Sequence, residues 1–149
     1  MSTFLVINGP NLNWLGKRDP EHYGTMTLAD IEKRIAARAK ELGVKVLFFQ
    51  SNHEGALMDY VQKNSGAADG IMINSGALSH YGLSLRDALV DAAKPIVEVH
   101  LSNLQAREEF RHKSIIAPIA KGYISGLGWQ GYLFALEYLA TNVKPAKGK

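Results

Sequence analysis

Five short apolar runs alternate with helix-like stripes along this chain, and this alternation constrains its fold more than any other feature. The runs lie at residues 4–7, 46–49, 70–74, 95–100 and 115–117. Apolar residues recur with helical spacing from Leu28, Leu57, Leu85 and Tyr132 onward, and a short helix is expected after Asn103. Continuous apolar strands are typical of a parallel sheet that helices cover on both faces. We therefore predict an α/β fold: a single domain with a flavodoxin-like, doubly wound, five-stranded parallel sheet.

Length and charge limit the class of protein. A chain of 149 residues is one ordinary domain, so residues 1–149 are treated as a unit. The net charge is +3, and Lys144, Lys147 and Lys149 lie in an expected loose tail at about 142–149. Without a basic stripe in the folded part, we expect no nucleic-acid partner. No apolar run approaches the ~18 residues of a membrane span, so we expect no membrane partner and a cytoplasmic location.

A long polar segment follows the first apolar run. Residues 9–26 are rich in Asn, Gly, Pro and charged residues, and they precede a helix that Thr27 and Asp30 are expected to cap and Gly43 to end. Unstructured loops of this length are uncommon in compact domains and are usually functional or mobile. We predict that residues 9–26 form a lid.

Polar side chains gather where the first, third and fourth strands are expected to end. In the predicted order these strands are neighbours, and ligands of open parallel sheets bind beyond the carboxyl ends of the strands. Each polar residue alone is also compatible with a strand-end cap or a turn. Their coincidence at three adjacent ends predicts one cleft that contains Asn8, Asn11, Asn74, His80, Glu98, His100, Ser102 and Asn103.

Glu98 and His100 are expected to point to the same face of the fourth strand, because they are two positions apart. A buried carboxylate and imidazole are costly unless they pair. The carboxylate would orient the ring and stabilise its protonated form, which makes a proton donor. A purely structural pair at a strand end is the alternative.

Arg18 and Tyr23 lie close together in the predicted lid. A free phenol has a pKa of about 10, which is too high for it to act as a base at neutral pH. A guanidinium beside it stabilises the phenolate, and a closing lid excludes water. The pair is a candidate base, and solvated or packing side chains are the alternative.

Patterns that indicate cofactors or metals are weak. The segment from Gly126 to Gly131 matches G-x-G-x-x-G in letters, but it precedes the last expected helix, which favours a turn and a helix start. The histidines show no close metal-ligating spacing, and cysteine is absent, which excludes disulfides and thiolate metal sites. Ser102 lacks the G-x-S-x-G context of a hydrolase nucleophile. We expect neither a metal nor a cofactor.

Several segments together resemble one enzyme family. Residues 8–24 (NGPNLNWLGKRDPEHYG) are similar to the signature of type II 3-dehydroquinate dehydratases. Residues 73–80 with 85–89, and 98–103 with 106–111, are similar to the second and third motifs of the family, and Gly126, Gly128 and Gly131 match its final helix. Ser75 stands where the family often has proline, and Trp14 where it commonly has leucine.

The resemblance implies dehydration of 3-dehydroquinate to 3-dehydroshikimate by anti elimination through an enolate, without metal or Schiff base. In this interpretation Tyr23 removes the proton next to the ketone, and Arg18 stabilises the developing charge. Asn11 helps to hold the hydrogen bond that supports the enolate. His100 protonates the departing hydroxyl, and Glu98 orients it.

The same resemblance implies residues that bind substrate and an oligomer. Asp87 would reach the site from a neighbouring subunit, as in a dodecamer built from four trimers. The groups that would hold the substrate within one subunit are Asn74, His80, Leu101, Ser102 and Arg111.

Two other functions stay open from the sequence. A flavin- or nucleotide-binding module fits the strand ends and the glycine run, although Pro10 removes a backbone donor where a phosphate would bind. A non-enzymatic assembly scaffold fits the aromatic last helix.

Overall fold

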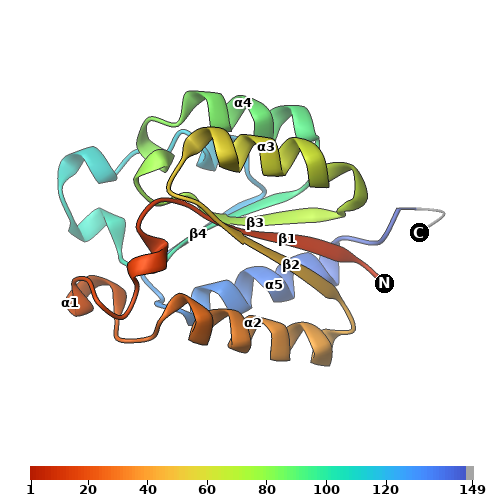
Figure 1. Ribbon diagram of the computed structural model, residues 1–149, viewed down its shortest axis with the longest axis horizontal. Helices are drawn as coiled ribbons and strands as arrows, with labels where there is room; N and C mark the ends of the chain where they lie inside the picture. Colours follow the sequence, from red (N-terminus) through yellow and green to blue (C-terminus); the bar gives the residue numbers. More distant parts are fainter. Residues whose placement is uncertain (147–149) are drawn as a thin grey trace.

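The computed structural model describes residues 1–146 and has one parallel sheet between two layers of helices (Figure 1). The strand order is β2-β1-β3-β4-β5. Neighbouring strands are parallel, and Asn8 at the end of β1 lies opposite Asn74 at the end of β3. This order confirms the predicted flavodoxin-like architecture. The strands are β1 (Thr3–Asn8), β2 (Lys45–Gln50), β3 (Gly70–Asn74), β4 (Ile96–His100) and β5 (Gly122–Ser125).

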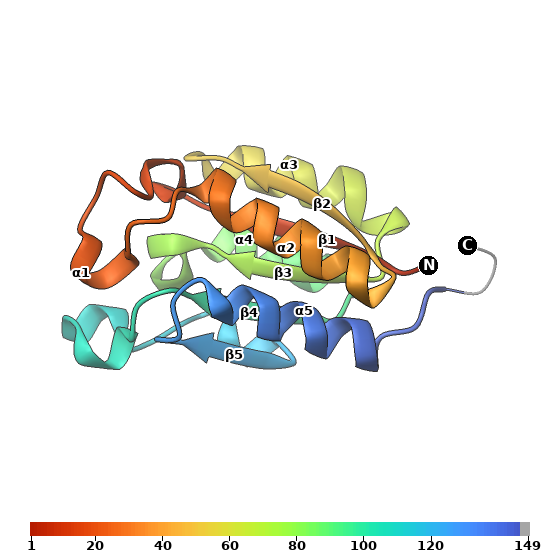
Figure 2. The same ribbon diagram turned by 90° about the horizontal axis from the view of Figure 1, so that it is seen from below.

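Helices cover both faces of the sheet (Figures 1 and 2). Alternate residues of β1 serve the two layers: Phe4 and Val6 pack on the side of α2 and α5, and Leu5 and Ile7 on the side of α3 and α4. All four side chains are fully buried, which is why the run is apolar throughout. The helices are α2 (Leu28–Leu42), α3 (Glu54–Asn64), α4 (Leu83–Ala92) and α5 (Gln130–Asn142).

Helix α2 begins and ends where the sequence predicts. The Thr27 hydroxyl accepts the Asp30 N–H and the Asp30 carboxylate accepts the Thr27 N–H, both at 3.1 Å. Gly43 follows the helix in the left-handed conformation, with φ of 70°. The capped start fixes the point at which the long first loop returns to the core.

The predicted fifth strand at residues 115–117 is wrong, because the fifth strand is β5, several residues later. Pro118 lacks an N–H and lies in a 3-10 turn, η6 (Ala117–Ile119), that begins at the last residue of the apolar run. Ile116 is fully buried in the α3/α4 side of the core. The run is therefore apolar because it packs beneath helices, while β5 is a short edge strand whose Tyr123 is partly exposed.

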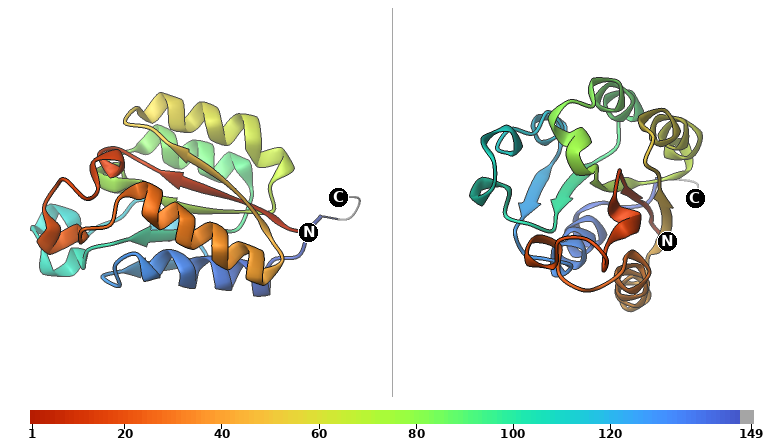
Figure 3. Two further views of the ribbon diagram at one scale, coloured as in Figure 1. Left: turned by 60° about the horizontal axis from the view of Figure 1, so that its bottom comes forward. Right: turned by 60° about the vertical axis from the view of Figure 1, so that its left-hand side comes forward.

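Short turns shape the loops at the carboxyl ends of the strands. The first loop is not structureless, because it contains the 3-10 turn η1 (Leu12–Trp14) and the one-turn helix α1 (Pro20–Tyr23). The helix expected after Asn103 is the single 3-10 turn η4 (Leu104–Ala106). Figure 3 shows α1 and this later segment at the same end of the molecule. The other 3-10 turns are η2 (Ser65–Ala67), η3 (Gly76–His80) and η5 (Glu109–Arg111).

The chain after α5 returns to the start of the sheet. The Ser2 hydroxyl donates to the Val143 carbonyl at 3.4 Å, and the Ala146 N–H donates to the Asp69 carboxylate at 3.1 Å. The rest of the predicted tail, residues 147–149, lies outside the described residues. Within residues 1–146, no helix combines the length and the apolar character needed to cross a membrane.

Candidate active site

A cavity lies beyond the carboxyl ends of β1, β3 and β4, where ligands bind in sheets of this order. Its walls come from the first loop, η3, the end of β4 and the segment through η5. Four of the residues predicted for the cleft or its chemistry do not line it: Asn8, Glu98, Asn103 and Asp87. The other predicted site residues do line it, and they are Asn11, Arg18, Tyr23, Asn74, His80, His100, Leu101, Ser102 and Arg111.

The ends of β1 and β3 approach so closely that only glycine fits between them. A Cβ on Gly9 would lie 2.5 Å from the Ser75 carbonyl oxygen, and the Gly9 N–H donates to the Asn74 carbonyl at 2.8 Å. Asn11 follows in the left-handed conformation, with φ of 69°, and its N–H donates to the Asn52 side chain at 2.9 Å. Asparagine tolerates this conformation better than most residues, so the turn brings Asn11 to the cavity wall.

Tyr132 of α5 connects the ends of β1 and β3 through its hydroxyl group. Its hydroxyl donates to Oδ1 of Asn8 at 2.6 Å and accepts from Nδ2 of Asn74 at 2.9 Å. Complete burial raises the pKa of Tyr132, so the phenol stays a neutral donor. Oδ1 of Asn74 accepts the Gly76 N–H at 3.1 Å. The Asn74 carboxamide is thus held at both ends, and one Nδ2 hydrogen remains for a ligand.

Two guanidinium groups flank the Tyr23 side chain. Nη1 of Arg107 donates to the Tyr23 hydroxyl oxygen at 2.7 Å and to the Ser102 hydroxyl at 3.2 Å. Arg18 lies over the ring, with Cζ 4.5 Å from the ring centroid. The predicted neighbour Arg18 therefore contacts the ring face, and the contact with the phenol oxygen belongs to Arg107. Two positively charged groups therefore lie beside the Tyr23 side chain.

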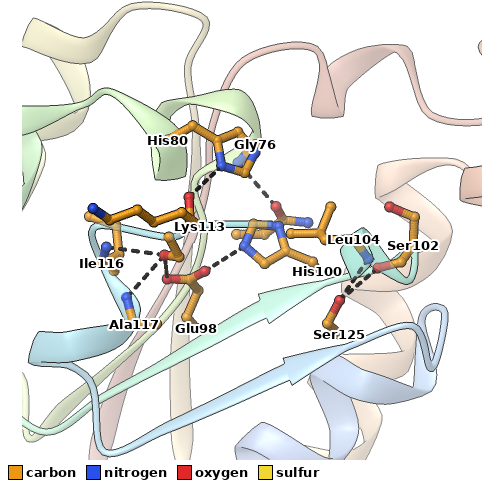
Figure 4. Close-up of polar contacts among 12 residues, drawn as sticks. Gly76, His80, Glu98, His100, Ser102, Leu104, Lys113, Ile116, Ala117 and Ser125 are labelled. Atoms are coloured by element: carbon orange, nitrogen blue, oxygen red, sulfur yellow. Dashed lines mark hydrogen bonds and ion pairs between the residues drawn. The ribbon is translucent and has the colours of Figure 1, made fainter. Parts of the chain in front are cut away.

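Glu98 and His100 lie side by side in β4 (Figure 4). Oε2 of Glu98 lies 2.6 Å from Nε2 of His100, and both residues are buried. Nδ1 of His100 has no hydrogen-bond partner among the described residues, and the ring lines the cavity. An imidazole oriented by a carboxylate and open to a cavity on its other nitrogen can exchange a proton with a ligand.

The remaining groups on the wall are polar and anchored. Nδ1 of His80 lies 2.9 Å from the Lys113 carbonyl, so one ring nitrogen is already engaged. Nε of Arg111 donates to the Glu108 carboxylate at 2.6 Å, and this bond holds the pKa of Glu108 below its usual value. The outer nitrogens of Arg111 stay available for a carboxylate.

Asp87 lies apart from this cavity. It sits on α4, its side chain is 78% exposed, and its nearest charged neighbour is Arg86 at 4.0 Å. Within one chain it does not join the other predicted site residues.

Sequence reasoning missed three residues that hold site groups in place: Arg107, Ser114 and Tyr132. Arg107 lies inside the motif at residues 106–111, but nothing in its spacing separates it from Arg111. Ser114 donates to Oε1 of Glu98 at 2.6 Å from a stretch that was expected to enter a strand. The spacing of Tyr132 predicts only an apolar position of the last helix, because no pattern reveals what its hydroxyl contacts.

The structure offers no preformed metal site in the part of the chain that it describes. No three His, Asp or Glu side chains among residues 1–146 gather as metal ligands would. Gly126 and Gly128 adopt positive φ values of 94° and 62°, and a Cβ on Gly131 would meet Ile124 at 3.1 Å. These glycines form a turn and a tightly packed helix start, which confirms that interpretation of the glycine run.

The sequence matches a known family model over nearly its whole length. The model described as dehydroquinase class II matches residues 2–140. Among curated relatives, 3-dehydroquinate dehydratase of Roseiflexus castenholzii is 60% identical over 135 residues, which is 91% of this chain and 86% of that protein. The Bacillus subtilis protein of the same name is 54% identical over 141 residues, or 95% of each chain.

Solved structures agree with this match. A type II dehydroquinase from Propionibacterium acnes superposes with a TM-score of 0.92 at 42% identity, and the alignment covers 95% of this chain and 98% of that one. A type II dehydroquinase from Butyrivibrio crossotus has a TM-score of 0.90 at 43% identity and covers 93% of this chain and 97% of its own.

Proposed function

Because this chain belongs to the class II dehydroquinase family of hydro-lyases, we propose that it dehydrates 3-dehydroquinate to 3-dehydroshikimate by anti elimination through an enolate. The observation that supports this most is the pair of proton-transfer groups on one cavity. Tyr23 lies there beside two guanidinium groups, and His100 lies there backed by a carboxylate. Family membership favours this reaction over the cofactor-binding module and the scaffold.

The first step removes the proton on the carbon next to the ketone. The Tyr23 phenolate accepts this proton, and the electron pair of the C–H bond moves into an enolate. Arg18 and Arg107 favour the phenolate before transfer, because each places a positive charge beside it. Asn11 supports the enolate oxygen, either directly or through a water molecule.

The second step expels the hydroxyl group. Nδ1 of protonated His100 donates a proton to the departing oxygen, which leaves as water while the enolate electrons form the new double bond. Glu98 keeps the ring oriented through Nε2 and stabilises its positive charge. The proton taken by Tyr23 and the one lost by His100 balance over a turnover, once solvent restores both groups.

The substrate is held by the remaining wall groups. Arg111 binds its carboxylate with the nitrogens that Glu108 leaves free. Asn74 and His80, together with the backbone at Leu101 and Ser102, bind its hydroxyl and carboxylate oxygens.

Asp87 acts in a neighbouring subunit. Its exposure on α4, away from the cavity of its own chain, supports a role across a subunit contact. We propose a homo-oligomer, a dodecamer of four trimers, in which Asp87 of one subunit reaches the next. We place the enzyme in the cytoplasm, where it serves either the shikimate pathway to aromatic amino acids or quinate breakdown, and we expect neither metal nor organic cofactor.

A direct assay tests this function. The purified protein should convert 3-dehydroquinate with a rise in absorbance from the conjugated product, and EDTA should leave the rate unchanged. Tyr23→Phe should abolish turnover but retain the fold and substrate binding, while Tyr138→Phe, at an exposed phenol on α5, should keep the full rate. Full activity of Tyr23→Phe would refute the assigned base, and no conversion by the wild type would refute the function.

A further inference from the structure

We propose that Ser114 is a positioning residue for the acid half of this site: it fixes the Glu98 carboxylate, and through it the tautomer of His100. The proposal rests on the proposed function, since it assigns Ser114 a part in the proton delivery by His100. Ser114 itself does not line the cavity and does not meet the substrate.

The hydrogen bonds of Ser114 leave its hydroxyl hydrogen only one destination. Its Oγ accepts the N–H of Ile116 at 3.1 Å and that of Ala117 at 3.0 Å, and backbone amides can only donate. Both lone pairs of the oxygen are therefore occupied. The hydrogen is therefore donated to Oε1 of Glu98, which lies 2.6 Å from Oγ.

Oε1 of Glu98 is thus an acceptor from Ser114, while the contact between Oε2 and Nε2 of His100 is compatible with two protonation states. In one state Glu98 is a carboxylate that accepts from Nε2–H of His100. In the other the pair has taken up one further proton from solvent, so that Glu98 is a carboxylic acid that donates to a bare Nε2 and the ring proton is on Nδ1. The Ser114 hydroxyl favours the first state, because a hydrogen bond to a charged acceptor is stronger than one to a neutral carbonyl.

The first state is the one that the reaction uses. With Nε2 protonated and bound to Glu98, Nδ1 of neutral His100 is free to gain a proton from solvent and then to donate it to the departing hydroxyl. In the second state Glu98 carries no charge to stabilise the imidazolium. Ser114 thus acts on the leaving group through two intervening residues.

Contacts on both sides of Ser114 hold its segment against the rest of the protein. Ile116 is fully buried, and the Ile115 N–H donates to the Ser79 carbonyl at 2.8 Å. The carbonyl of Lys113, one residue before Ser114, engages Nδ1 of His80. The apolar run at residues 115–117, which resembles a strand in the sequence, therefore holds Ser114 in contact with Glu98.

Kinetics of Ser114→Ala test the proposal. We expect kcat to fall by about 10- to 100-fold, with KM changed less than about threefold. The fall should not exceed the lower end of the roughly 10²- to 10⁴-fold range for proton-transfer groups, because Ser114 acts only through Glu98. Ser114→Thr keeps a hydroxyl and should restore most of kcat. Ser79→Ala is the matched control, because Ser79 is also a buried serine but its hydroxyl has no partner among the described residues. A wild-type kcat in folded Ser114→Ala, or an equal loss in Ser79→Ala, would overturn the proposal.

A spectroscopic measurement tests the same point without turnover, and its first part needs no variant of Ser114. In ¹⁵N-histidine NMR of the wild-type protein, with His100 assigned by its loss in His100→Ala, neutral His100 should carry its proton on Nε2. A proton on Nδ1 would overturn the proposal. In Ser114→Ala, where it folds, the Nδ1–H tautomer should gain population. If the wild type fails to convert 3-dehydroquinate, the function is wrong, and this readout still decides the Ser114 arrangement.

Discussion

Nη1 of Arg107 lies 2.7 Å from the hydroxyl oxygen of Tyr23, although 84 positions separate the two residues in the chain. A guanidinium only donates and keeps its charge at all ordinary pH values, so the phenol oxygen is the acceptor. Tyr23 belongs to α1 in the first loop, and Arg107 follows η4. The position of the loop and the charge environment of the phenol are therefore set by the same contact.

Replacement of Arg107 by glutamine should lower kcat strongly. The variant removes the positive charge at the phenol oxygen and the donor to the Ser102 hydroxyl. We expect kcat to fall by about 10²- to 10³-fold, as for the loss of other groups that stabilise charge in the transition state. Steady-state kinetics with 3-dehydroquinate measure this, and circular dichroism checks the fold.

Arg38→Gln is the charge-matched control for this variant. Arg38 forms ion pairs with Glu41 and Glu137 at 2.7 Å, at the α2–α5 surface and away from the cavity. Its loss should leave kcat within a factor of about two, since exposed ion pairs contribute little. A similar fall in both variants would mean that total charge, and not the Tyr23 contact, sets the rate.

The fold could be predicted from the sequence because its signals are local. The apolar runs of β1, β3 and β4 are buried on both faces and that of β2 is partly buried, and the Thr27 and Gly43 ends of α2 have specific chemistry. The fifth strand was missed because burial alone does not distinguish a strand from a loop packed under helices, as Ile116 shows. Pro118 is the one signal that argued against a strand there.

The candidate site could be predicted only as far as strand ends bring residues together. The positions of Asn74 and His100 follow from the strand order. Which arginine reaches the Tyr23 oxygen depends on the path of the loop after β4, which no periodicity describes. The partners of buried hydroxyls, such as those of Ser114 and Tyr132, depend on side-chain geometry and leave no trace in a single sequence.

Removal of the Tyr132 hydroxyl should destabilise the protein. Tyr132→Phe leaves Oδ1 of Asn8 and Nδ2 of Asn74 without this partner inside the core. An unsatisfied buried polar group costs about 1–3 kcal/mol. We therefore expect the free energy of unfolding, measured with urea, to fall by about 1–3 kcal/mol or more, because two groups lose their partner. Tyr138→Phe, at an exposed phenol, should change it by less than about 0.5 kcal/mol. Equal stabilities of the two variants would contradict the buried network.

Tyr132 should also make the protein less stable at alkaline pH. Burial raises the pKa of this phenol above its ordinary value of 10.0. At a pH between about 10 and the raised pKa of the folded state, the phenol has lost its proton in the unfolded chain and still binds it in the folded chain. The stability that is present below about pH 10 is therefore lost as the pH rises through this range. Urea midpoints should fall more steeply above about pH 10 in the wild type than in Tyr132→Phe. Parallel curves would show that Tyr132 does not contribute.

A methyl group at Gly9 should separate the two strand ends that carry Asn11 and Asn74. The added Cβ would lie 2.5 Å from the oxygen and 2.7 Å from the carbon of the Ser75 carbonyl, and backbone atoms cannot rotate away. Gly9→Ala should therefore lose about 1–3 kcal/mol of stability, as in other overpacked sites, and kcat/KM should fall by at least about tenfold.

Gly55→Ala is the control for this change, because Gly55 lies in α3 and a Cβ there meets nothing within 4 Å. Alanine has a higher helix propensity than glycine, so the free energy of unfolding of this variant should rise by up to about 1 kcal/mol and its activity should be unchanged. Urea unfolding and steady-state kinetics compare the two. If Gly9→Ala behaves like Gly55→Ala, the strand ends are not in close contact, and the placement of Asn11 beside Asn74 has another cause.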